Sequence, residues 1–116
     1  MKKETGFPSP AQGYEAKNID LNHLLINNPP ATFFMQLVSA DMAGFGFLPG
    51  SILIVDRSQK PGNGSFVVLR HFDELLCREL VLKENKIIFS NGKTDIEPNQ
   101  YETEIIGTVR AIIKKL

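Results

Sequence analysis

The feature that most constrains the fold is a series of short apolar runs, rich in Val, Ile, Leu and Phe, that are separated by turn residues. Such runs are typical of β-strands, and the Gly, Pro, Asn and Asp residues between them are typical of tight turns. Many short strands with little helix predict a mostly β domain, a sandwich or barrel of short twisted strands. The predicted strands are residues 32–38, 51–56, 64–72, 75–82, 86–90 and 105–113.

The stretch IDLNHLLI at residues 19–26 predicts one short helix near the N-terminus. Asp20 is a suitable N-cap, and three leucines behind it recur at helical spacing. The sequence Asn-Asn-Pro-Pro at residues 27–30 ends the helix, because proline cannot continue it. We therefore expect a helix near residues 20–27.

The glycines and prolines divide the chain into an arm and a single domain. Residues 1–18 contain the sequence GFPSPAQG, which predicts an extended N-terminal arm. Residues 19–116 are expected to form one compact domain, since 42% of the chain is hydrophobic and a core can be built without a disulfide or a metal. The sequence PGNG at residues 61–64 lacks the Gly-Lys-Ser/Thr of a phosphate loop, and we interpret it as a hairpin turn.

Composition argues against several classes of protein. The chain carries 13 Lys and Arg against 13 Asp and Glu, and they are scattered, which argues against sequence-specific DNA binding. The single cysteine, Cys77, excludes a disulfide within the chain and favours the cytoplasm. No apolar run approaches the roughly 20 residues of a membrane span. We expect neither a metal nor a cofactor, because the Cys and two His residues have no ligand spacing.

Several conspicuous side chains have ordinary structural interpretations. We expect Cys77 to fill space on its strand, His23 to be exposed on the short helix, and His71 to have no role beside a turn. The phenylalanines are not interleaved with lysines, so they indicate core or interface rather than nucleic-acid binding. They are Phe33, Phe34, Phe45, Phe47, Phe66 and Phe89.

Four stretches of the chain resemble a known family. They are GFPSPA at residues 6–11, IDLNHLLI at 19–26, the run from 34 to 56 that ends in ILIVD, and EIIGTV at 104–109. Together they are similar to the UmuD branch of the LexA-type self-cleaving serine peptidases. The resemblance implies a mostly β domain that dimerises. It also implies a Ser-Lys dyad whose lysine must be neutral to accept the serine proton, and a substrate bond in the chain's own N-terminal arm.

The residues that align with the dyad cannot perform its chemistry. Counting back from ILIVD, Asp41 falls on the catalytic serine, and a second alignment leaves the nucleophile position empty. Arg78 falls on the lysine, and an arginine does not deprotonate in a protein. Ser39, two residues from the motif position, is the one fallback nucleophile. The sequence therefore predicts that the catalytic dyad is lost.

Asp41 and Arg78 could instead bind one another. Arg78 is in phase with leucines on an apolar face of its predicted strand, and a buried guanidinium needs a partner. We predict an Asp41–Arg78 ion pair in place of the dyad, with room for bidentate hydrogen bonds. The alternative is that both side chains are exposed and unrelated.

The arm also departs from the family pattern. Only Met1 to Thr5 precede Gly6, so the bond that the family would cut is Thr5–Gly6. We expect this cleavage site to be vestigial, and the chain to resemble the processed form of UmuD.

The resemblance implies a binding role rather than a catalytic one. The expected protein is a catalytically inactive, UmuD′-like homodimer that serves as an accessory subunit of a UmuC-type, Y-family translesion DNA polymerase in the bacterial SOS response to DNA damage. Contact with a RecA filament stays open. Two alternatives remain: an atypical but active S24-type self-cleaving peptidase that uses Ser39, and a dimerisation domain derived from a phage or plasmid repressor.

Overall fold

A computed structural model describes residues 19–116. The predicted arm at residues 1–18, with Thr5 and Gly6, lies outside the described residues. The helical elements are α1 (Leu21–Leu25) and the 3-10 turns η1 (Pro29–Ala31) and η2 (Ala43–Phe45). The strands are β1 (Thr32–Gln36), β2 (Ile52–Asp56), β3 (Phe66–His71), β4 (Glu74–Lys83), β5 (Lys86–Ser90), β6 (Asp95–Ile96) and β7 (Thr103–Ile113).

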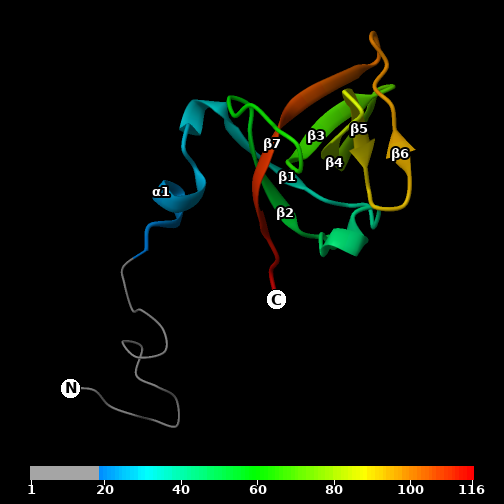
Figure 1. Ribbon diagram of the computed structural model, residues 1–116. Helices are drawn as coiled ribbons and strands as arrows, with labels where there is room; N and C mark the ends of the chain where they lie inside the picture. The colour runs from blue at the N-terminus through cyan, green and yellow to red at the C-terminus, as the bar shows by residue number, and fades with distance from the viewer. Residues whose placement is uncertain (1–18) are drawn as a thin grey trace, which may run out of the picture.

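All seven strands belong to one antiparallel sheet in the order β1-β2-β7-β3-β4-β5-β6. The long strand β7 lies between the β1–β2 pair and the β3–β6 group (Figure 1). Its register shifts once against β2, between Ile54 and Val55, and once against β3, between Val68 and Leu69. Such bulges bend a strand and increase its twist, so they allow the sheet to curl.

The expected mostly β class, with a short helix near the N-terminus, is confirmed. Asp20 caps α1 as predicted, because its side chain accepts hydrogen bonds from the backbone N–H groups of Asn22 and His23. The predicted strands all form, with ends that differ from the prediction by at most two residues. Only the two-residue strand β6 was not predicted.

Two tight turns form the hairpins on either side of β4. The residues Phe72 and Asp73 have φ of 49° and 67°, and Glu84 and Asn85 have φ of 51° and 64°. Positive φ at both central residues is the type I′ geometry, whose twist matches that of the flanking strands. The interpretation of residues 61–64 as a hairpin turn is wrong: Ser65 N–H does bond to the Gly62 carbonyl, but β2 and β3 are separated by β7.

The curled sheet encloses one main core. Leu37, which follows β1, belongs to the same buried cluster as Cys77 on β4, although β1 and β4 are far apart in the strand order. This contact requires the sheet to fold over on itself. A second cluster packs on the other face of β3 and β4, so both faces of these strands are buried. Its members are Val67, Leu69, Leu80 and Phe89.

In residues 19–116 no helix has the length and apolar character needed to cross a membrane. The same residues hold no group of three or more His, Cys, Asp or Glu side chains placed to bind a metal ion.

Candidate functional site: a cleft between the β1–η2 loop and β4

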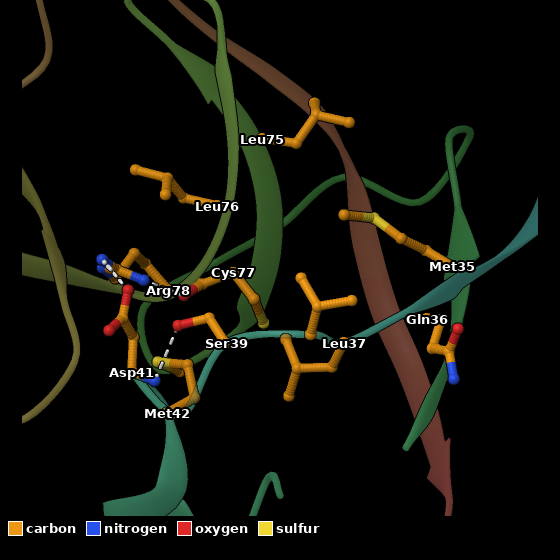
Figure 2. A pocket seen from close by; sticks show the side chains of 11 residues that line it. Met35, Gln36, Leu37, Ser39, Asp41, Met42, Leu75, Leu76, Cys77 and Arg78 are labelled. Atoms are coloured by element: carbon orange, nitrogen blue, oxygen red, sulfur yellow. Dashed lines mark hydrogen bonds and ion pairs between the residues drawn. The ribbon is translucent and has the colours of Figure 1, made fainter. Parts of the chain in front are cut away.

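A small cleft of about 60 Å³ lies where the chain leaves β1 and passes over the first half of β4 (Figure 2). The loop is held in place by Met42, which is buried in the main core, and by a hydrogen bond from Leu37 N–H to the Ser51 carbonyl. Both anchors fix the chain on either side of Ser39 and Asp41. The cleft is lined by Met35, Gln36, Leu37, Val38, Ser39, Asp41, Met42, Leu75, Leu76, Cys77 and Arg78.

The strand β4 contributes an open edge to this cleft. Its residues 74–79 pair with β3 on one side, but pairing with β5 on the other side begins only at Glu79. The backbone of residues 74–78 is therefore free of a strand neighbour on the cleft side within the described residues. An edge of this kind can hold an extended segment through backbone hydrogen bonds.

The structure brings Asp41 and Arg78 together, as the sequence predicted. An Nη2 atom of Arg78 lies 3.4 Å from Oδ2 of Asp41 (Figure 2). The Arg78 side chain is 8% exposed and that of Asp41 is 50% exposed, so the guanidinium is buried and the carboxylate lies at the surface. The contact is single and long; the bidentate geometry is not present.

The other donors of Arg78 are unevenly used. Nη1 donates to the carbonyl of Cys77 at 2.8 Å, whereas the buried Nε has no partner among the described residues. Burying a guanidinium costs free energy, and the few acceptors around Arg78 offset that cost, so the loss of any one of them should destabilise the fold. The backbone acceptor at Cys77 could not be foreseen from the sequence, because every residue carries the same carbonyl group.

Ser39 lies in the cleft but is engaged in the local turn. Its Oγ accepts a hydrogen bond from the backbone N–H of Asp41 at 3.0 Å, which is an ordinary serine turn. The described residues that line the cleft include neither a lysine nor a histidine. A serine nucleophile needs a base within hydrogen-bond reach, and no such base adjoins Ser39 here.

Cys77 is the other nucleophilic side chain at the cleft. Burial raises the pKa of its thiol to about 12, and the neighbouring positive charge of Arg78 offsets only part of that effect. A thiol with such a pKa is protonated at neutral pH and is a poor nucleophile. The interpretation of Cys77 as a small core residue agrees with this placement in the main cluster.

The mostly β fold, with one antiparallel sheet and a short N-terminal helix, is the fold class that the family resemblance implied, and the cleft brings together Asp41 and Arg78. The chain belongs to the Peptidase S24-like family, which matches residues 1–110. It is 33% identical to Protein MucA of Salmonella typhimurium over 108 residues, 90% of this chain and 74% of MucA.

Two further comparisons agree with this membership. The chain is 33% identical over 110 residues to Protein SamA of Salmonella typhimurium strain LT2, covering 95% of this chain and 79% of SamA. It is 38% identical over 80 residues to Protein ImpA of Escherichia coli, covering 69% of this chain and 55% of ImpA. MucA, SamA and ImpA are UmuD-like, so the resemblance inferred from the sequence motifs is confirmed.

Proposed function

We propose that this chain is a catalytically inactive, UmuD′-like accessory subunit that acts as a homodimer and binds a UmuC-type, Y-family translesion DNA polymerase during the SOS response. The observation that supports inactivity is the contact between Asp41 and Arg78 in the cleft, at the two positions that align with the dyad. The polymerase, the response and the homodimer rest on the UmuD-like relatives. A RecA filament is a second partner of the same origin, and the single cysteine favours the cytoplasm.

The chemistry of the two side chains supports the loss of peptidase activity. Attack on a peptide bond by a Ser-Lys dyad requires a hydroxyl nucleophile and a neutral amine that accepts its proton. A carboxylate at Asp41 is a weak nucleophile toward an amide. The guanidinium of Arg78 stays protonated and cannot serve as the general base. Each member of the contact therefore binds the other instead of activating it.

Incubation of the purified chain, and of a fusion with a longer arm ahead of Gly6, tests the loss of catalysis. Intact mass spectrometry over hours at neutral and alkaline pH should show no cut at Thr5–Gly6. The matched control is the same fusion with Ser39→Ala. Cleavage that Ser39→Ala abolishes would overturn the proposal in favour of the active peptidase, with Ser39 as the nucleophile.

Co-purification tests the accessory role separately. The tagged chain, expressed with a UmuC-type polymerase, should retain the polymerase through a size-exclusion column. Failure to retain it would remove the accessory role without restoring catalysis.

The repressor-derived alternative is supported by one observation. The chain is 30% identical to the LexA repressor of Hahella chejuensis over 92 residues, which are 75% of this chain and 46% of that repressor. The polymerase experiment separates the two candidates, because a dimerisation domain alone gives no reason to bind a polymerase.

A further inference from the structure

The open edge of β4 ends at Arg78. Residues 74–78 have no strand neighbour on the cleft side within residues 19–116, whereas Glu79 is paired with Ser90 of β5. A segment that pairs with this edge therefore meets the end of β5 once it reaches Arg78. A passing chain would have to leave the sheet at that point, but a chain that ends at Arg78 can pair with the edge along its whole length.

The backbone groups that β4 presents to the cleft follow from the turn that precedes it. The two-residue type I′ turn at residues 72–73 makes the residues on either side of it a hydrogen-bonded pair. Because bonding alternates along the strand, Leu75 and Cys77 direct their N–H and C=O groups away from β3, to the open edge. The hydrogen bond from Arg78 Nη1 to the Cys77 carbonyl agrees with this direction. The N–H and C=O of Leu75 and the N–H of Cys77 are therefore available to a ligand.

The guanidinium of Arg78 stands at the end of this edge with an unused donor. Its side chain is 8% exposed, and the buried Nε has no partner among the described residues. Nε and Nη2 form one side of the guanidinium fork, which can bind a carboxylate through two parallel hydrogen bonds. Asp41 uses this side poorly, because its carboxylate reaches only Nη2, at 3.4 Å. Another carboxylate could therefore be held at Arg78 more tightly than Asp41 is.

Asp41 can leave the guanidinium without being buried elsewhere. Its side chain is half exposed, and Arg78 is the one side chain in residues 19–116 that contacts its carboxylate. Water can solvate the displaced carboxylate, whereas a buried guanidinium needs an acceptor. A ligand carboxylate that pairs with both Nε and Nη2 would exchange with Asp41, and the positive charge of Arg78 would stay compensated.

The cleft away from this ion pair has apolar walls that are open to solvent. Leu75 on β4 and Val38 in the facing loop both line the cleft and are both exposed. Figure 2 shows Leu75 and Met35 at a distance from the Asp41–Arg78 contact. An extended ligand places every second side chain on the same face, so the residue two positions before its end would lie beside Leu75. The cleft therefore favours an apolar residue at that position of the ligand.

From these features we infer that the cleft binds the C-terminus of a partner protein: the last residues of the partner pair with β4 as a parallel strand, and their terminal carboxylate replaces Asp41 on Arg78. The direction is parallel because Arg78 lies at the C-terminal end of the open edge. The occupant is a chain end because β5 blocks the continuation of the edge and because the unused donor of Arg78 is matched by a carboxylate. This inference rests on the loss of catalysis, but not on the polymerase or on the homodimer.

Selection from two peptide pools tests the chemistry of the ligand. Both pools contain acetylated hexapeptides with random residues at the last four positions; one pool ends in a free carboxylate and the other in an amide. The immobilised chain should retain the acids at least about tenfold over the amides, as measured by mass spectrometry, because the amide lacks the charge-assisted bidentate contact. The retained acids should be enriched in apolar residues two positions before the end.

The two members of the ion pair should change binding in opposite directions. For a retained peptide acid measured by fluorescence anisotropy, Arg78→Met should raise the dissociation constant at least about tenfold. Asp41→Asn should lower it about threefold or more, because the competing carboxylate is gone. An ion pair that serves folding alone would not strengthen binding when Asp41 is replaced. A thermal melt by circular dichroism verifies that both variants fold.

A charge on the apolar wall supplies a matched pair of variants. Leu75→Glu places a carboxylate beside the bound peptide and removes an apolar contact, so it should raise the dissociation constant about tenfold. The control is Leu82→Glu, which places the same charge at a similarly exposed leucine of β4 that does not line the cleft. The control should bind the peptide acid as the wild type does.

The outcomes separate this inference from the function on which it rests. Equal retention of acids and amides, retention of neither, or equal effects of Leu75→Glu and Leu82→Glu overturn the C-terminal site and leave the loss of catalysis in place. Peptides recovered shortened, with a cut that Ser39→Ala abolishes, overturn the loss of catalysis and this inference with it. Retention of the polymerase is measured independently and is unaffected by either result.

Discussion

The guanidinium of Arg78 lies 3.4 Å from the carboxylate of Asp41, and the two groups differ in exposure by a large margin. Arg78 is almost completely buried, whereas half of the Asp41 side chain is in contact with solvent. Loss of Asp41 would therefore leave a buried charge that water reaches poorly, whereas loss of Arg78 would leave a carboxylate that water can solvate. This asymmetry predicts different costs for removing the two charges.

Removing the carboxylate of Asp41 should destabilise the fold more than replacing the buried guanidinium of Arg78 by an apolar side chain. Asp41→Asn leaves a buried charge without its ionic partner, and we expect a loss of about 1–2 kcal/mol, between the values for exposed and buried pairs. Arg78→Met replaces the ion by an apolar side chain and should stay within about 1 kcal/mol of wild type. Urea unfolding of both variants and of the double variant measures these differences.

The double variant provides the decisive comparison. If the ion pair stabilises the fold, Asp41→Asn should lower the free energy of unfolding no further in the Arg78→Met background, because the positive charge that Asp41 compensated is gone. An equal cost of Asp41→Asn in both backgrounds would show that the carboxylate acts alone, through the turn that it shares with Ser39.

The thiol of Cys77 should be unreactive in the folded chain. Its pKa is about 12, so at pH 8 only about one thiol in 10,000 is ionised. We expect a maleimide to label the folded chain more than about a thousandfold more slowly than the unfolded chain in guanidinium. Arg78→Met should slow it further, because the positive charge of Arg78 lowers the pKa of Cys77. Comparable labelling rates for folded and unfolded chains would contradict the burial of this side chain.

The sequence predicts most local structure here because the signals are local. Asp20 caps α1 through its own side chain, and the turns at residues 72–73 and 84–85 join strands that are neighbours in the sheet. The error at residues 61–64 has a different cause. The strand β7, which separates β2 from β3, comes from the end of the chain, and no residue near position 62 encodes that long-range pairing. The strand β6 is too short for any alternation to be visible.

The sequence predicted which two residues of the candidate site would meet, but not the geometry of their contact. The motif spacing located Asp41, and the phase of the apolar residues on β4 placed Arg78 on a buried face. The single contact and the exposure of Asp41 depend on the path of the loop, which is set by the anchors at Leu37 and Met42. Those anchors act through tertiary packing, which the sequence pattern does not specify.

The stability of the fold should depend on Asp56 in acid. The carboxylate of Asp56, at the end of β2, accepts hydrogen bonds from the hydroxyl of Ser58 at 2.6 Å and from its backbone N–H at 2.8 Å, and these bonds hold its pKa below the ordinary value of 3.8. In the window below that value the unfolded chain binds more protons than the folded chain, so stability rises with pH. The contribution is complete above about pH 4 and is lost as the pH falls through the lowered pKa.

Unfolding in urea at a series of pH values measures this effect. Asp56→Asn should be less stable than wild type at pH 7, and the difference between the two should shrink below about pH 4. Ser58→Ala removes the hydroxyl donor but keeps the backbone donor, so it should remove only part of the pH dependence. An Asp56→Asn profile parallel to that of wild type would mean that other carboxyl groups cause the acid sensitivity.

The close approach of β7 to β2 at Gly107 should tolerate no side chain. A β-carbon on Gly107 would lie 2.6 Å from Cγ1 of Val55 and 3.1 Å from the carbonyl oxygen of Asp56. The Val55 side chain is fully buried in the main core, so it has little room to move, and the backbone carbonyl has still less. Gly107→Ala should therefore cost about 1–3 kcal/mol by overpacking. The control is Gly62→Ala, where a β-carbon meets nothing within 4 Å and φ is not positive, so stability should not fall. Equal stability of the two variants would show that the strands separate at little cost, and that the contact between β2 and β7 is looser than this geometry requires.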